Sequence, residues 1–135
     1  MTHIFTYGTL MVPSIFLAVS GKAYPSKKAV LSGYARYRVK MQDYPGIIAS
    51  PGDRVEGIVY FGVDDTHVHR LDLFENEYFY YRTAVSLEIE KEMVHAEAYV
   101  IKPEYRQVLS NEEWDFENFK KHHQQVYLDQ YSGFW

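Results

Sequence analysis

The chain has 135 residues, 47% of them hydrophobic, so it can bury the core of one compact domain, which we expect to span residues 1–135. Its 14 Lys and Arg against 18 Asp and Glu give a net charge of −4, which argues against a nucleic-acid-binding protein. The absence of cysteine excludes disulfides, a cysteine nucleophile and thiolate metal sites. Without a leader-like N-terminus or an apolar run of ~20 residues, the chain is expected to be cytoplasmic and not bound to a membrane.

The first half of the chain is predicted to form strands around one short helix. A strand over residues 3–7 ends at Gly8, and a helix over Pro13–Gly21 follows, because proline suits a first turn and glycine a stop. Residues 28–42 alternate in their second half, with a basic face of Arg36, Arg38 and Lys40. Residues 44–48 are predicted as a turn into a short strand, residues 50–53 as a second turn, and residues 54–63 as a longer strand.

The second half begins with a helical period over residues 64–75 and continues with a hairpin. Its strands are runs at 82–90 and 94–101, with the turn near Lys91 and Glu92. The order of elements is neither a regular alternation of strands and helices nor all-β. It therefore predicts an α+β domain with a strongly curved or barrel-like sheet.

A C-terminal helix is predicted from its start signals. Ser110 is the candidate N-cap, Glu113 completes a capping box, and Leu109 and Trp114 are placed to form a hydrophobic staple. The side chains expected to hold this helix on the domain are Trp114, Phe119, Val126 and Tyr127.

Glu75 falls on the apolar stripe of the predicted helix. At about 100° per residue it lies between Val68 and Leu71, where the pattern expects an apolar side chain. A carboxylate directed at a core is costly unless it is paired, and burial would raise its pKa into the range of a proton shuttle near neutral pH. The alternative is a helix-end glutamate that faces solvent or pairs with Arg70 or Arg82.

Other candidate sites are weaker. His67 and His69 would share one side of a strand as metal ligands, but they point apart on a helix, and no complete ligand set is visible. The basic face of Arg36, Arg38 and Lys40 could hold an acidic ligand, although a solvent-facing side of a strand is the ordinary alternative. The 13 tyrosines could line a cavity or simply pack a core that is rich in strands.

Four short motifs occur in order: "YGTL" at residues 7–10, "YPGI" at 44–47, "VEGIVY" at 55–60 and "LDLFENEYFYYR" at 71–82. Together they resemble the γ-glutamylcyclotransferase-like superfamily, also called AIG2-like, from the first strand to about Tyr99. The resemblance implies a small mixed β-barrel with flanking short helices. It also implies a reaction that releases an amine from a γ-glutamyl compound by closure to 5-oxoproline.

The resemblance implies roles for six residues. Glu75 would be the catalytic acid and base, and the loop of Tyr7, Gly8, Thr9 and Leu10 would hold the glutamyl group through backbone N–H groups. Gly8 would allow the chain to turn and the ligand to approach closely. Tyr81 matches a family tyrosine that follows the glutamate and would line the pocket.

The implied reaction needs no cofactor and no metal, because the substrate brings its own nucleophile, the α-amine. We therefore expect a small γ-glutamyl compound as the partner of a protein that is a monomer or a homodimer. γ-Glutamyl-amines and γ-glutamyl-amino acids are expected in preference to whole glutathione. Two alternatives stay open: a catalytically silent binding module on the same fold, and a metal-dependent barrel that uses His67 and His69.

Overall fold

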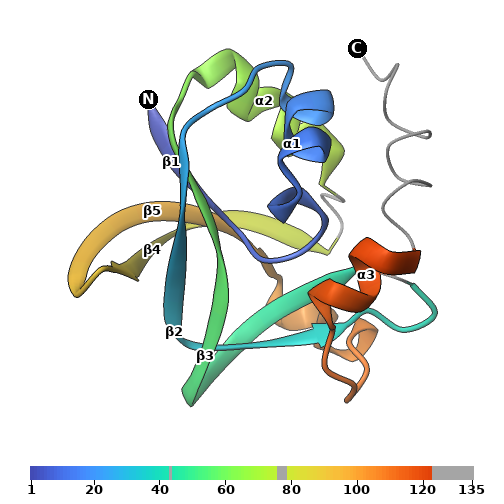
Figure 1. Cartoon of the computed structure of the whole chain (residues 1–135). Helices are drawn as coiled ribbons and strands as arrows, with labels where there is room; N and C mark the ends of the chain where they lie inside the picture. Colours follow the sequence, from blue (N-terminus) through green and yellow to red (C-terminus); the bar gives the residue numbers. More distant parts are fainter. Residues whose placement is uncertain (43, 76–78, 123–135) are drawn as a thin grey trace.

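The computed structural model describes residues 1–42, 44–75 and 79–122, and within them five strands form one sheet (Figure 1). They lie in the order β1-β3-β2-β4-β5, and the sheet closes on itself as a barrel. β1 pairs parallel with β5, and the other neighbours pair antiparallel. The strands are β1 (Thr2–Thr6), β2 (Ser26–Arg38), β3 (Pro45–Val63), β4 (Tyr80–Ile89) and β5 (Glu92–Ile101). The expected α+β fold with a mixed, barrel-like sheet is confirmed.

Short helices flank the barrel. α1 (Pro13–Ser20) and α2 (Asp65–Phe74) lie together near the N-terminus, and α3 (Phe116–His122) lies beside the ends of β2 and β3 (Figure 1). The 3-10 turns η1 (Thr9–Met11) and η2 (Pro103–Val108) complete the described elements. α1 matches its prediction: Pro13 is in its first turn, and Gly21 ends it with a left-handed φ of 92°.

The turn expected at residues 50–53 does not separate two strands. β3 runs through it and pairs with β2 along its length, but the register jumps between the pairs Ser32–Arg54 and Tyr34–Ala49. Four residues of β3, 50–53, thus lie opposite one residue of β2, Gly33, and Gly52 has a φ of 89°. A turn-forming sequence is accommodated here as a bulge within a continuous strand.

The predicted capping box of the C-terminal helix is wrong. α3 begins at Phe116, and Asp115 caps it, because its Oδ1 accepts a 3.0 Å hydrogen bond from the N–H of Glu117. Ser110 instead pairs with β2, since its N–H and its hydroxyl both donate to the carbonyl oxygen of Arg38, at 2.8 and 2.7 Å. Trp114 and Phe119 are buried as expected, whereas residues 126 and 127 lie outside the described residues.

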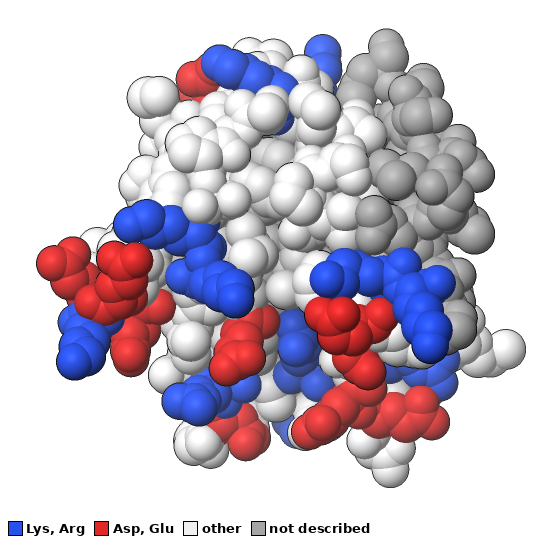
Figure 2. Space-filling model, in the orientation of Figure 1, with Lys and Arg blue, Asp and Glu red and all other residues white. Residues whose placement is uncertain are grey.

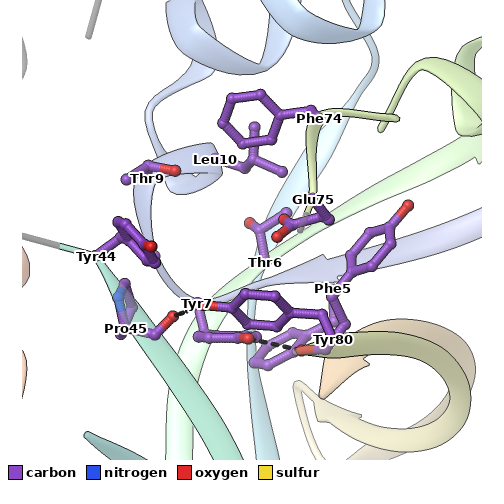
Figure 3. A pocket seen from close by; sticks show the side chains of 12 residues that line it. Phe5, Thr6, Tyr7, Thr9, Leu10, Tyr44, Pro45, Phe74, Glu75 and Tyr80 are labelled. Atoms are coloured by element: carbon purple, nitrogen blue, oxygen red, sulfur yellow. Dashed lines mark hydrogen bonds between the residues drawn. The ribbon is translucent and has the colours of Figure 1, made fainter. Parts of the chain in front are cut away.

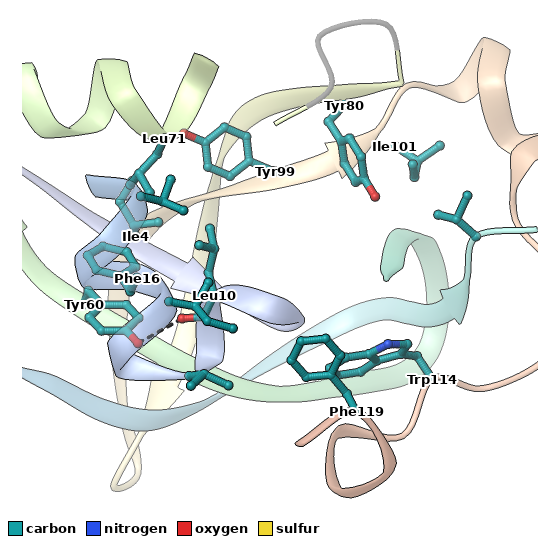
Figure 4. Close-up of a cluster of buried hydrophobic side chains, with 14 of the residues drawn as sticks. Ile4, Leu10, Phe16, Tyr60, Leu71, Tyr80, Tyr99, Ile101, Trp114 and Phe119 are labelled. Atoms are coloured by element: carbon teal, nitrogen blue, oxygen red, sulfur yellow. Dashed lines mark hydrogen bonds between the residues drawn. The ribbon is translucent and has the colours of Figure 1, made fainter. Parts of the chain in front are cut away.

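A buried aromatic pair holds the chain that leaves β1. The rings of Phe16 in α1 and Tyr60 in β3 stack with centroids 3.7 Å apart (Figure 4). The hydroxyl of Tyr60 donates a 2.9 Å hydrogen bond to the carbonyl oxygen of Leu10. Because both rings are buried, this contact fixes the loop of residues 7–10 against the barrel.

Figure 2 shows one face of the molecule, with Lys and Arg interspersed among Asp and Glu over its lower half. The described residues of this face therefore do not form a large patch of one sign, such as binds nucleic-acid phosphates. None of the helices in the described part of the chain is long and apolar enough to cross a bilayer.

Candidate active site

A cavity of about 170 Å³ opens at one end of the barrel, where five segments meet (Figure 3). β1 and the loop after it form one wall, the start of β3 a second, and the end of α2 with β4 and β5 the rest. The lining residues are Phe5, Thr6, Tyr7, Gly8, Thr9, Leu10, Tyr44, Pro45, Phe74, Glu75, Tyr80 and Tyr99. Half of these residues are aromatic, and a lining of aromatic and apolar side chains with a few polar groups is typical of a small-molecule site.

Glu75 supplies the carboxyl group of this cavity. α2 ends at Phe74, and Glu75 follows in extended backbone, with φ −70° and ψ 144°, while its N–H still donates to Leu71 at 3.0 Å. Val68 and Leu71 are buried on the inner side of α2, as the helical pattern predicts. Glu75 is partly buried, and burial together with the negative charge of Asp72 raises its pKa from 4.5 to about 8.

Asp72 is held beside the cavity by two partners. The hydroxyl of Tyr99 donates to its Oδ1 at 2.6 Å, and Arg82 donates from Nη1 to Oδ1 and Oδ2 at 3.0 and 2.9 Å. Arg82 also donates from Nε to Glu97 at 3.2 Å. Arg82, one of the two partners considered for Glu75, is thus bound to two other carboxylates.

The loop of Tyr7–Leu10 passes directly from β1 into the turn η1. Tyr7 is buried, and its hydroxyl donates to the carbonyl oxygen of Tyr99 at 2.6 Å. The loop closes through the N–H groups of Met11 and Val12, which donate to Gly8 and Thr9 at 3.0 and 3.3 Å. The N–H groups of Gly8, Thr9 and Leu10 have no acceptor among the described residues. They remain available to an anionic or carbonyl oxygen in the cavity.

A side chain at position 8 would collide with the opposite wall of the cavity. The backbone of Gly8, with φ −138° and ψ −131°, is neither helical nor extended. A Cβ at this position would lie 2.7 and 2.8 Å from Cγ and Cδ of Pro45. Pro45 lines the opposite wall, so glycine allows the two walls of the cavity to meet.

Tyr81 is not part of the cavity lining. It is 41% exposed and lies on a shallower hollow outside, which also borders Asp72, Glu75 and Glu97. Its neighbour Tyr80 lines the cavity instead and donates a hydrogen bond to the carbonyl oxygen of Pro45 at 2.7 Å. The structure thus places Tyr80 in the cavity and Tyr81 in the adjoining hollow, and a substrate contact by Tyr81 stays a prediction.

Several lining residues were not singled out from the sequence. Tyr44 and Pro45 stand in the "YPGI" motif, which could have indicated them, and Phe74 directly precedes Glu75. Tyr99 had no local signal: it reaches the cavity only because β5 closes the barrel against β1.

The other candidate residues lie elsewhere. His67 on α2 contacts the hydroxyl of Tyr24, whereas His69 is exposed, so the two histidines do not converge. Among the described residues, no group of three or more His, Cys, Asp or Glu is placed to hold a metal ion. Arg38 pairs with Glu112 at 2.8 Å, and Lys40 is exposed.

Comparison with known proteins places this chain in a family. A sequence model described as "Gamma-glutamyl cyclotransferase, AIG2-like" matches residues 4–116. Protein AIG2 C from Arabidopsis thaliana is 30% identical over 129 residues, spanning 94% of this chain and 77% of that protein. A solution structure of an Arabidopsis thaliana protein has a TM-score of 0.74 at 29% identity and covers 96% of this chain and 78% of its own. A structure named gamma-glutamyl cyclotransferase shares the fold, with a TM-score of 0.63 at 19% identity over 75% of this chain and 66% of its own. The chain therefore belongs to the gamma-glutamyl cyclotransferase, AIG2-like family.

Proposed function

We propose that this protein is a γ-glutamyl cyclotransferase, which releases an amine or amino acid from a γ-glutamyl compound and forms 5-oxoproline. The observation that carries the proposal is a partly buried glutamate, Glu75, whose pKa of about 8 suits proton transfer, in a cavity bordered by unpaired backbone N–H groups. Family membership supports the reaction class. We expect γ-glutamyl-amines and γ-glutamyl-amino acids to be better substrates than whole glutathione.

The reaction is an intramolecular displacement. The substrate α-amine attacks its own γ-carbonyl carbon, a C–N bond of a five-membered ring forms, and the bond to the leaving nitrogen breaks. The cavity contributes by holding the glutamyl chain in a folded conformation, since a well-oriented intramolecular attack can gain ~7–11 kcal/mol. The aromatic walls of Tyr44, Phe74 and Tyr80 restrict the chain and exclude water.

Glu75 carries the proton in this scheme. The substrate binds as an ammonium ion, so the α-nitrogen loses two protons, one before attack and one after the ring bond forms, and the leaving nitrogen takes up both and departs as an ammonium ion. A carboxylate with a raised pKa is a stronger base toward the ammonium ion, and once protonated it is the acid that the leaving nitrogen needs. One carboxyl group between the two nitrogens performs both transfers.

The loop of residues 7–10 supplies hydrogen-bond donors for negative charge. The N–H groups of Gly8, Thr9 and Leu10, which have no acceptor in the described part of the chain, can bind the substrate α-carboxylate or the oxygen that becomes negative when the γ-carbonyl is attacked. Donors that belong to a fixed backbone need no reorganisation during the reaction, which makes their stabilisation effective.

The test is incubation of the purified protein with a panel of γ-glutamyl-amines, γ-glutamyl-amino acids and glutathione, with 5-oxoproline detected by mass spectrometry. α-Glutamyl isomers and N-acetyl-γ-glutamyl compounds are the controls, because the first lack the γ-linkage and the second lack a nucleophilic amine. Release of 5-oxoproline from the γ-glutamyl compounds alone supports the proposal. Binding of γ-glutamyl compounds without any turnover would identify a silent binding module instead.

The same assay after exhaustive chelation tests the metal-dependent alternative. Turnover should be unchanged, since the proposed steps use Glu75 and backbone groups. Loss of turnover on chelation, restored by one divalent ion, would show that the reaction depends on a metal site.

A further inference from the structure

Arg36 extends from β2 to the loop that borders the cavity, although it does not line the cavity itself. Its Nη1 donates to the carbonyl oxygen of Tyr7 at 2.7 Å and to that of Glu56 in β3 at 3.1 Å. The guanidinium also lies 5.4 Å from the ring centroid of Trp114, within the range of a cation–π contact. These contacts hold one partly buried positive charge behind the Tyr7–Gly8 peptide.

The geometry of that peptide decides where the Gly8 N–H points. No peptide bond among the described residues is cis, and in a trans peptide the C=O and the following N–H point in opposite directions. The carbonyl of Tyr7 is directed at Arg36, which borders a separate hollow with Ala35, Arg54 and Trp114. The N–H of Gly8 therefore points away from Arg36, and Gly8 lines the cavity that contains Glu75.

We propose that Arg36 is a positioning residue that holds the Tyr7–Gly8 peptide with its N–H directed at the negatively charged oxygen of the bound glutamyl group. This inference rests on the proposed function, because it assigns a role within the same site. Arg36 acts from outside the cavity and touches no substrate atom. It thereby differs from a surface arginine that merely faces solvent, the ordinary alternative for the basic side of this strand.

The physical effect of Arg36 is twofold. A charge-assisted hydrogen bond is stronger than a neutral one, so the carbonyl is restrained and the peptide cannot rotate away from the cavity. A cation at the carbonyl oxygen also polarises the peptide, and consecutive hydrogen bonds along one line strengthen each other. The Gly8 N–H then becomes a better donor without placing a cation where it would compete for the substrate carboxylate.

The first test needs no ligand. Amide NMR signals of Gly8 are compared in the parent protein and in Arg36→Met, Arg36→Lys and Arg38→Met. Arg38 is the matched control, because it lies on the same strand and is partly buried, but its side chain pairs with Glu112 and not with the loop. Arg36→Met should shift the Gly8 amide signal, and Arg38→Met should leave it unchanged.

The second test measures the affinity for 5-oxoproline and the steady-state constants of the best γ-glutamyl substrate. Loss of a charge-assisted hydrogen bond predicts about a 10-fold effect in Arg36→Met. If the N–H binds the α-carboxylate, Arg36→Met should weaken 5-oxoproline binding and raise KM. If the N–H binds the developing oxyanion, Arg36→Met should lower kcat and leave 5-oxoproline binding unchanged. Arg38→Met should match the parent in both measurements.

Chemical rescue separates a positioning role from a folding defect. Arg36→Ala opens space in the hollow beside Trp114, and methylguanidinium added to this variant should restore part of the lost affinity or turnover. The inference would be overturned if the Arg36→Met variant behaved like the Arg38→Met control, with an unchanged Gly8 amide signal, affinity and turnover. If no γ-glutamyl compound reacts with the parent, the proposed function fails, and the NMR comparison still decides whether Arg36 holds the Gly8 amide.

Discussion

The hydroxyl of Tyr99 donates a 2.6 Å hydrogen bond to Oδ1 of Asp72, which precedes Glu75 by three residues in the chain. Burial and the carboxylate partner raise the pKa of Tyr99, so its hydroxyl keeps the proton that it donates. The carboxylate of Asp72 thus lies near Glu75 while Tyr99 and Arg82 both bind it. A fixed negative charge next to a partly buried carboxyl group favours the protonated form of Glu75.

Replacement of the proton carrier should remove turnover while leaving the fold intact. Glu75→Gln keeps the shape and the hydrogen-bonding capacity but cannot exchange a proton, so we expect turnover to fall ~10²-fold or more. Release of 5-oxoproline is the measurement, and circular dichroism checks the fold. Glu88→Gln, an exposed change on β4, is the control and should match the parent. Near-parental turnover in folded Glu75→Gln would remove Glu75 from the mechanism.

The same variant should change the dependence of stability on pH. The folded state binds the Glu75 proton up to about pH 8, whereas in the unfolded chain this proton is lost near pH 4.5. Raising the pH between these values therefore lowers the free energy of unfolding of the parent, by up to roughly 5 kcal/mol above pH 8. Glu75→Gln has no such proton to lose. The free energy of unfolding of the variant minus that of the parent should therefore increase from pH 4.5 to 8.

Denaturant unfolding of both proteins at pH 5, 7 and 9 measures this difference. Glu88→Gln is again the control, and its offset from the parent should not change with pH. A constant offset between Glu75→Gln and the parent across the range would show that Glu75 ionises as an ordinary exposed carboxylate.

The charge of Asp72 should set the acid side of the pH–rate profile. In the parent, kcat/KM should fall as the pH drops below about 8, because Glu75 becomes protonated before substrate binds. Asp72→Asn removes the neighbouring negative charge and lowers the pKa of Glu75, so the fall should begin at a lower pH. Glu97→Gln removes the other carboxylate bound to Arg82 and should leave the profile in place. Identical profiles for Asp72→Asn and Glu97→Gln would contradict this role of Asp72.

The contact between Gly8 and Pro45 should couple the two walls of the cavity. Gly8→Ala adds a Cβ within 2.8 Å of the proline ring, so we expect a stability loss of about 1–3 kcal/mol and weaker 5-oxoproline binding. Pro45→Ala removes the two ring carbons that the Cβ would meet. In the double variant the added cost of Gly8→Ala should largely disappear, which a double-mutant cycle of unfolding free energies measures.

Thr9→Ser serves as a comparison, since a loop that binds through backbone N–H groups should tolerate it with most of the activity retained.

Full additivity of Gly8→Ala and Pro45→Ala in unfolding free energy would mean that the two residues are not in steric conflict.

Local signals in the sequence were sufficient for several parts of this protein. Pro13 and Gly21 delimit α1 because each restricts or frees the backbone at its own position, and those effects do not depend on the rest of the chain. The helical stripe of Val68 and Leu71 indicated the inner face of α2, and Glu75 at its end lies in the cavity. The ordered motifs from Tyr7 to Arg82 indicated the family, which the matched family model confirms.

Other features depended on contacts between segments that are distant in the chain. Ser110 has the sequence of a helix cap, yet it binds Arg38 because the backbone at the end of β2 offers a competing partner. Val85, Leu87 and Ile89 alternate along β4 and are buried. If this alternation continued toward the start of the strand, the side chain of Tyr81 would also be buried. That pattern fails near the end of the barrel, where the opposite face of β4 is covered and Tyr80 packs there with Ile101.

By itself, the sequence thus determined the ends of α1, the curved-sheet class, the family and the one acidic residue on an apolar stripe. These follow from backbone restrictions and residue periods that act over a turn or a strand. Only the tertiary structure decided that Tyr80 and Tyr99 line the cavity, that Pro45 faces Gly8 and that Arg36 holds the carbonyl of Tyr7. Those contacts are set by the strand order and register of a closed barrel, which brings together residues that no local pattern relates.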